Sequence, residues 1–231
     1  MRAPALQALG PRRGRVAVPL ALAFVVVAGW AGTLRLGAAL EGHAGHHAGL
    51  TALFAMWAAM AVAMMVPVEA PSLLRLARGL RETGTFLVGY LLPWLAFSIG
   101  AAALQERLHA AGWMDAGLAT GSGRLAAALL VVAGLVQLSP AREACLARCR
   151  AASLTAAGTG GLSGGLRASL ASIACCGLLM LVPLATGVMS VAWMVALTLL
   201  LVVERELPRA SRIGALAGVL LLVFGAWKFV T

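Results

Sequence analysis

Residues 56–71, MWAAMAVAMMVPVEAP, are the stretch from which the fold of this chain can be worked out. Their apolar character predicts a buried helix, and at about 100° per residue Met56, Met60 and Met64 fall along one stripe of it. Met65 points roughly the other way. A row of thioethers at this spacing can be ordinary packing, because methionine fills gaps well, or a ladder for a soft metal such as Cu(I). The stretch alone leaves both interpretations open.

Composition indicates the class of protein. Of the 231 residues, 61% are hydrophobic and 11% are charged, whereas about a quarter of a soluble domain is charged. Apolar runs long enough to cross a bilayer recur at about residues 16–34, 50–67, 85–104, 125–139, 166–186, 187–203 and 213–230. In lipid, backbone polar groups must bond within their own segment. The sequence therefore predicts an all-α fold, a polytopic membrane helix bundle of about seven transmembrane helices.

The positive charges predict how these helices are oriented. One set of alternate connections carries fourteen Lys and Arg residues, and the other set carries four, which are Arg35, Arg107, Arg124 and Lys228. Because cytoplasmic loops are enriched in basic residues, we expect the N-terminus and the basic connections to be cytoplasmic, in a bacterial inner membrane. The net charge of +10 is then a topology signal, and we expect no binding to nucleic acid.

The chain is expected to form one transmembrane domain, residues 16–231, behind a basic cytoplasmic tail at residues 1–15. The start is similar to a signal peptide, but its apolar run is long for one, so we expect an uncleaved first helix. Residues 151–165 are rich in Gly, Ala, Ser and Thr, which predicts a flexible loop within the domain.

Three small features predict how helices end and pack. Pro67 and Pro71 are expected to kink or end the methionine helix. Glu69 lies between them, and we expect it at the membrane interface, because carboxylates within the hydrocarbon are rare. The last predicted helix contains Gly214-x3-Gly218, a spacing that lets two helices approach closely.

The four cysteines occur as two pairs. Cys145 and Cys149 would share one face of a helix one turn apart, close enough to ligate one metal. Their predicted side is cytoplasmic, so a structural disulfide is not expected. Cys175 and Cys176 fall near the midplane of a predicted span, where adjacent residues diverge by about 100° and reach one ion only if the helix loosens. Buried cysteines are also common packing residues, so both interpretations remain open.

Further donors lie at other depths of the predicted bundle. Met180 follows Cys176 by about one turn. His43, His46 and His47 lie in the first outer connection, where imidazoles could capture copper, zinc or nickel. A polar loop that is rich in histidine explains the same three residues equally well. The sequence contains no P-loop, H-E-x2-H or catalytic-triad pattern, so we expect the protein not to be an enzyme.

Three motifs resemble those of an uncharacterised bacterial family of predicted metal-binding integral membrane proteins. The first is M-W-x2-M-x2-A-M-M-x-P-x3-P at residues 56–71. The second is Q-L-[ST]-P at 137–140, followed by C-L-x2-C-R at 145–150. The third is a Cys-Cys pair followed by Leu-Met, then G-x-M-x3-W-M and a Glu that ends the span, within residues 175–204. The resemblance covers about residues 50–208 and implies a membrane-embedded metal site.

The sequence thus favours an integral membrane protein that binds a soft transition metal, copper first, and translocates or delivers it. Soft donors that are uncharged when empty suit a membrane interior, where burying carboxylates would cost most. The expected Cu(I) ligands, listed from outside to inside, are His43, His46, His47, Met56, Met60, Met64, Met180, Cys175, Cys176, Cys145 and Cys149. The expected partners are the bilayer, the metal ion and a metallochaperone or metalloenzyme. The alternative is a non-metal membrane scaffold or assembly partner whose Met and Cys residues only pack.

Overall fold

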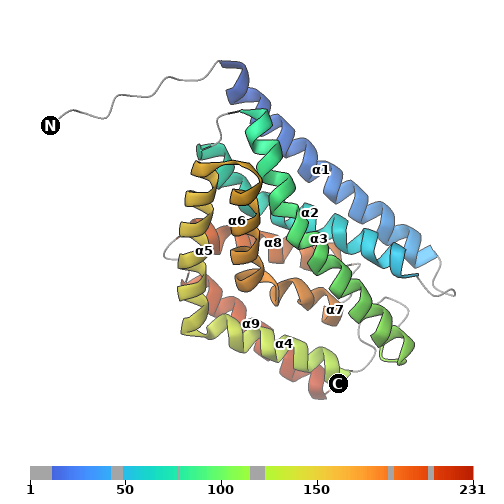
Figure 1. Ribbon diagram of the computed structural model, residues 1–231. Coiled ribbons are helices and arrows are strands. Elements are labelled where there is room, and N and C mark those ends of the chain that lie inside the picture. The colour runs from blue at the N-terminus through green and yellow to red at the C-terminus, as the bar shows by residue number, and fades with distance from the viewer. Residues whose placement is uncertain are drawn as a thin grey trace.

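The computed structural model describes residues 12–42, 49–76, 79–114, 123–186, 190–207 and 211–230. Every element within these ranges is a helix (Figure 1), which confirms the all-α class. The helices are α1 (Arg12–Gly42), α2 (Leu50–Leu76), α3 (Leu80–Ala110), α4 (Gly123–Leu138), α5 (Pro140–Thr159), α6 (Gly161–Cys176), the 3₁₀ turn η1 (Leu179–Leu181), α7 (Val182–Thr186), α8 (Val191–Glu206) and α9 (Ser211–Val230).

α2 is the central helix of the bundle. It packs against α1, α3, α5 and α8, so its apolar side chains are buried on several sides at once. The four methionines between residues 56 and 65 are each at most 1% exposed. α2 also continues through Pro67 and Pro71 to Leu76, so the expectation that these prolines end the helix is wrong. Packing on four neighbours supports the turns in which proline removes a hydrogen bond.

Four helices of the described residues are long and apolar enough to cross a membrane, and they correspond to α1, α2, α3 and α9. Two bent pairs raise that number to six if each pair is one span. α4 and α5 meet at 71°, and α6 meets the segment formed by η1 and α7 at 68°. α8 has 16 residues, about 24 Å of helix, against a hydrocarbon core of about 30 Å. The count of seven spans therefore stays a prediction.

The segment predicted to be a flexible loop, residues 151–165, is helical. α5 runs to Thr159 and α6 begins at Gly161, with Gly160 (φ +69°) as the only residue between them. The prediction is wrong because small residues also serve close helix crossings. A Cβ added at Gly165 of α6 would lie 2.6 Å from the backbone nitrogen of Tyr90 in α3. The small residues therefore let α6 approach α3 almost to backbone contact.

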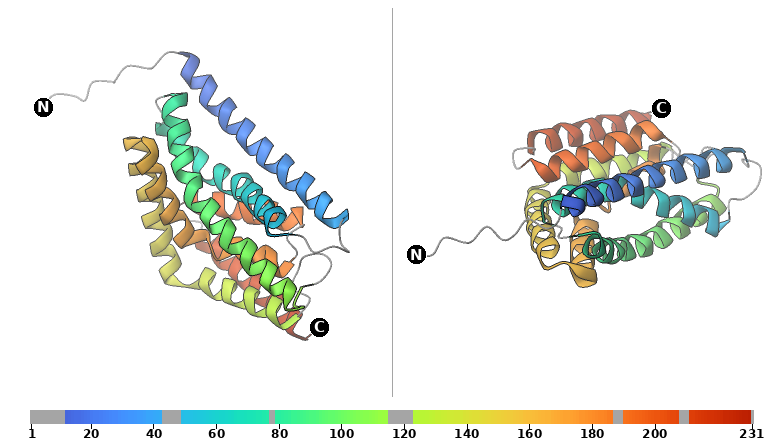
Figure 2. Two further views of the ribbon diagram at one scale, coloured as in Figure 1. Left: turned by 45° about the vertical axis from the view of Figure 1, so that its right-hand side comes forward. Right: turned by 90° about the horizontal axis from the view of Figure 1, so that it is seen from above.

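The close approach predicted from Gly214-x3-Gly218 is confirmed, and the partner of α9 is α4, which lies along it in Figures 1 and 2. A Cβ at Gly218 would lie 3.1 Å from the carbonyl oxygen of Gly134 and 2.9 Å from the side chain of Leu138. Gly214 faces the side chains of Glu204 and Gln137. The α4–α9 pair therefore closes one side of the bundle next to two buried polar residues.

We expect Gly165→Ala to destabilise the protein by about 1–3 kcal/mol or more, because its methyl group would overlap the backbone of α3. Gly100→Ala in α3 is the matched control, since a Cβ there meets nothing within 4 Å. That change should be neutral or stabilising by up to about 1 kcal/mol through helix propensity. Thermal unfolding in detergent measures both, and equal effects would contradict the close α3–α6 crossing.

Candidate functional site

A buried ion pair joins α2 to α8. Glu69 is 0% exposed, and its carboxylate pairs with the guanidinium of Arg205. Ser153 of α5 donates a hydrogen bond to the same carboxylate oxygen at 3.3 Å, and Arg205 donates to Ser153. Glu69 is thus buried within the protein, and its expected depth at the membrane interface stays a prediction. Burial is possible because α8 supplies the opposite charge and α5 an additional hydrogen bond.

A second buried ion pair joins α5 to the adjacent residue of α8. Arg142, 5% exposed, donates to Glu204 at 2.5 Å and to the carbonyl oxygen of Cys175 in α6 at 2.7 Å. Gln137 of α4 donates to the other oxygen of the Glu204 carboxylate. Two consecutive α8 residues, Glu204 and Arg205, therefore hold α2, α4, α5 and α6 in place around them.

The four cysteines gather where α5 packs on α6. Cys145 and Cys175 form a disulfide, with their Cα atoms 5.7 Å apart. Cys149 and Cys176 are free, buried at 1% and 3% exposure, and close enough to interact electrostatically. The expectation that the two cysteine pairs lie at different depths is therefore wrong, and a disulfide joins the two pairs where no structural disulfide was expected. The reason is that α5 folds back alongside α6, which brings residues 30 positions apart into contact.

Met65 of α2 and Cys149 of α5 each lie one helical turn before a contact between their helices. Glu69 of α2 contacts Ser153 of α5, and both helices run toward the same end of the molecule (Figures 1 and 2). Met65 precedes Glu69 by four residues, and Cys149 precedes Ser153 by four residues. Both residues therefore lie one turn back from the Glu69–Ser153 contact, each on its own helix.

α6 carries the second free thiol, Cys176, one helical turn after Ser172. Tyr90 of α3 and Ser172 of α6 share a hydrogen bond of 3.1 Å, and Tyr90 interacts electrostatically with the Glu69–Arg205 pair. Because α6 runs opposite to α5, the four-residue step from Ser172 to Cys176 leads in the same direction as the step from Ser153 to Cys149. We call Met65, Cys149 and Cys176 the sulfur layer.

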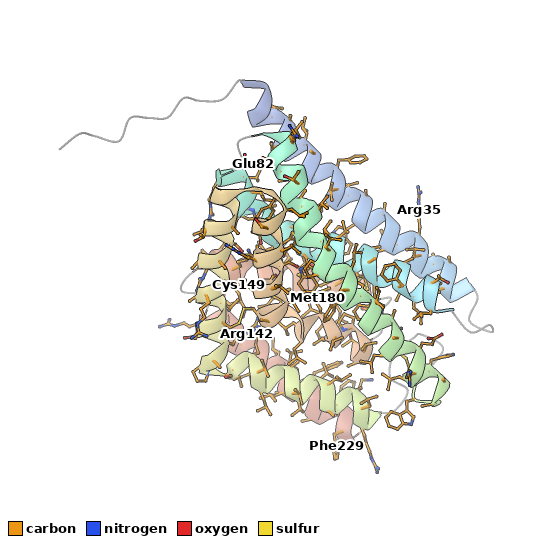
Figure 3. The ribbon with its side chains drawn as sticks, in the orientation of Figure 1. Arg35, Glu82, Arg142, Cys149, Met180 and Phe229 are labelled. Atoms are coloured by element: carbon orange, nitrogen blue, oxygen red, sulfur yellow. A yellow bond between two sulfur atoms is a disulfide. The ribbon has the colours of Figure 1, made fainter. Side chains whose placement is uncertain are left out.

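The sulfur layer lies between the two buried ion pairs. Along α5, Cys149 is about 6 Å from the level of Ser153 and about 10 Å from the level of Arg142, at 1.5 Å per residue. Figure 3 shows Arg142 and Cys149 at successive heights in this part of the molecule. Arg205 interacts electrostatically with both thiols, and Arg142 interacts with Cys176. Arg205 and Arg142 therefore place positive charges near the two thiols of the sulfur layer.

The predicted methionine stripe lies on a different face of α2. Met60 and Met64 are within about 60° of Trp57 around the helix, and the indole of Trp57 donates to Gln105 of α3 at 2.6 Å. Met64 is about 140° from Glu69, whereas Met65 is about 40° from it. Met65 is not among the ligands that the sequence predicted, although its four-residue spacing to Glu69 puts the two residues on one face of α2.

The other predicted ligands are the three histidines and Met180. His43, His46 and His47 lie outside the described residues. Met180 is 0% exposed, in η1 beyond the bend that follows α6 (Figure 3). Among the described residues, no group of three or more His, Cys, Asp or Glu side chains is arranged to hold a metal.

Buried thiols and thioethers inside a bundle of apolar helices define a class of protein that can hold a soft metal away from water. Comparison with known families agrees. The family model described as PpoB2, copper chaperone, matches residues 54–228, which is most of the chain. The protein therefore belongs to the PpoB2 copper chaperone family. No curated protein matches the chain, and no solved structure matches it.

We expect Arg205→Met to lower the free energy of unfolding by about 3–5 kcal/mol, because it leaves the buried carboxylate of Glu69 unpaired. Arg75→Met is the matched control. Arg75 pairs with Glu206 between the same two helices, but its side chain is 60% exposed, so the loss should stay below about 1 kcal/mol. Thermal unfolding of the two variants provides the comparison.

The double variant Glu69→Leu/Arg205→Met removes both buried charges. It should recover most of the stability lost in Arg205→Met, since replacing a whole buried pair by apolar residues is often neutral. A double variant less stable than Arg205→Met alone would show that the buried carboxylate of Glu69 is not destabilised by the loss of Arg205.

Proposed function

We propose that this protein is an integral membrane copper chaperone that binds Cu(I) in the sulfur layer and delivers it to a copper-requiring partner. The observation that carries the proposal is the pair of free, buried thiols of Cys149 and Cys176, which lie on the packed helices α5 and α6 and interact electrostatically. Met65, one turn before Glu69 on α2, is proposed as the third donor. Membership of a copper chaperone family supports copper as the metal.

The chemistry of the donors favours Cu(I) over harder ions. Thiolate and thioether sulfur are soft ligands and select Cu(I), whereas oxygen ligands suit magnesium, calcium or manganese. Two thiolates and one Cu(I) ion carry a net negative charge. Arg205 interacts electrostatically with both thiols, and its Nη1 has no hydrogen-bond partner in the described part of the chain. A donor is therefore free to compensate that charge on the protein side.

Several apolar helices support placement in a membrane, and the proposed orientation has the N-terminus in the cytoplasm. The α5–α6 region carries Arg148, Arg150 and Arg167, which places it toward the cytoplasmic side by the distribution of basic residues. In this proposal, delivery of copper is stoichiometric binding and release, and it needs no enzyme activity. The proposed partners are the bilayer, the metal ion and a metallochaperone or metalloenzyme that receives it.

We expect Cys149→Ser and Cys176→Ser each to weaken Cu(I) binding by more than about 100-fold, because even outer-shell partners contribute about 10–100-fold. The serine hydroxyl is a hard donor that matches Cu(I) poorly. Competition with a Cu(I)-specific chromophoric chelator, under anaerobic conditions and on reduced protein in detergent, measures the affinity.

Met65→Leu tests the thioether donor, with Met64→Leu as the matched control on the other face of α2. Leucine keeps the volume and apolar character of methionine, so each change should cost less than about 1.5 kcal/mol of stability. Only Met65→Leu should weaken Cu(I) binding. Unchanged Cu(I) affinity in Met65→Leu, Cys149→Ser and Cys176→Ser alike would support the alternative function, a scaffold whose sulfur residues only pack.

The orientation predicts the result of reporter fusions. A fusion after Gly79 should report the cytoplasm, and fusions after Ala44 or Gly117 should report the outside, because basic residues concentrate in the first set of connections. Alkaline phosphatase and a fluorescent protein give opposite signals on the two sides. The reverse pattern at two of these three points would contradict both the orientation and the helix count.

A further inference from the structure

The disulfide and the free thiols of the α5–α6 interface are direct neighbours. Cys149 follows Cys145 by one turn of α5, and Cys176 follows Cys175 in the chain. Their exposure differs. Cys145 is partly exposed, whereas Cys149 and Cys176 are at most 3% exposed. One member of the disulfide is therefore accessible from outside the bundle, while the free thiols lie behind it.

The position of this disulfide is unusual for a structural bond. The basic residues around α5 and α6 indicate the cytoplasmic side, where disulfides are rare and those that form are usually transient or redox-active. The two sulfurs also do not hold the interface alone. Arg142 reaches across it to the Cys175 carbonyl oxygen at 2.7 Å, and α5 packs along α6. Reduction would therefore leave α5 and α6 in place.

We propose that Cys145 and Cys175 are a redox-active dithiol that reduces Cu(II) to the Cu(I) form that the neighbouring sulfur layer binds. Two Cu(II) ions and the two thiols yield two Cu(I) ions, the disulfide and two protons. Each thiol supplies one electron, its S–H bond breaks, and one S–S bond forms. The inference rests on the proposed function, because it makes the sulfur layer the acceptor of the reduced ion.

Donor chemistry explains why reduction and binding belong together. A layer of two thiols and one thioether favours Cu(I), so an arriving Cu(II) ion has to gain an electron before it fits. The dithiol adjoins the layer, and Cys145 is its partly exposed sulfur, which an arriving ion can reach. Cytosolic thiols can then restore the pair by thiol–disulfide exchange, in which two external thiols become a disulfide.

Arg142 positions the dithiol. It lies three residues before Cys145 on α5 and donates to the backbone of Cys175, which holds the two Cα atoms 5.7 Å apart, within the range that a disulfide needs. Its own charge is compensated by Glu204. The ion pair thus keeps the two sulfurs close in both redox states.

The test uses the full chain in detergent, reduced, freed of reductant and kept anaerobic. Hydrated Cu(II) is added, Cu(I) is counted with a Cu(I)-specific chelator, and the remaining thiols are counted after the copper is removed. Wild-type protein should produce two Cu(I) ions and lose two of its four thiols. Trypsin separates Cys145 from Cys149 by cutting after Arg148, so mass spectrometry shows which of the two α5 cysteines joined the disulfide with the Cys175–Cys176 peptide.

Two double variants separate reduction from binding. Cys145→Ser/Cys175→Ser should lose the reduction of Cu(II) yet retain preformed Cu(I). Cys149→Ser/Cys176→Ser should still reduce two Cu(II) ions and form the disulfide, yet release all Cu(I) to the chelator. Cys145→Ser alone, a milder change, should likewise fail to form a disulfide at this position.

Several outcomes would overturn the inference. The inference is wrong if wild-type protein reduces no Cu(II). It is also wrong if Cys145→Ser/Cys175→Ser protein reduces Cu(II) at the wild-type rate. A Cys149–Cys176 disulfide in wild-type protein would also overturn it. Failure of the proposed function looks different, because no variant would then retain preformed Cu(I), whereas formation of the Cys145–Cys175 disulfide would persist.

Discussion

The structure depends on two opposite charges that stand next to each other near the end of α8 and are both buried. Glu204 and Arg205 each need a partner, because an unpaired charge away from water costs several kcal/mol. Arg142 and Glu69 supply those partners from α5 and α2. The requirement fixes how three helices face one another, and the position of Cys149 and Met65 follows from it.

The choice of sulfur between these charges has a physical reason. Thiols and thioethers are neutral when empty, so the layer needs no further counter-charge before a metal arrives. Carboxylate ligands at the same place would have required additional buried cations. The arginines already present interact with the thiols, and they match the negative charge that a Cu(I)–thiolate complex would bring. In the proposed function, the same two ion pairs serve both stability and metal binding.

Small residues let the helices come close enough for this arrangement. Gly165 allows α6 to touch the backbone of α3, and Gly160 turns the chain back within one residue. The return of α6 alongside α5 is what brings four cysteines from two distant motifs to one interface. Residues 151–165 look like a flexible linker by composition, but small side chains serve a close helix crossing equally well.

The sequence by itself determined the helical class, the buried character of α2 and the soft chemistry of the donors, because these depend on composition and on spacing within one helix. Only the tertiary structure decided which sulfurs meet. It paired Cys145 with Cys175 and buried Glu69. The contact between Glu69 and Arg205 spans 136 positions of the chain, and periodicity within a helix carries no information on the partner that it will face.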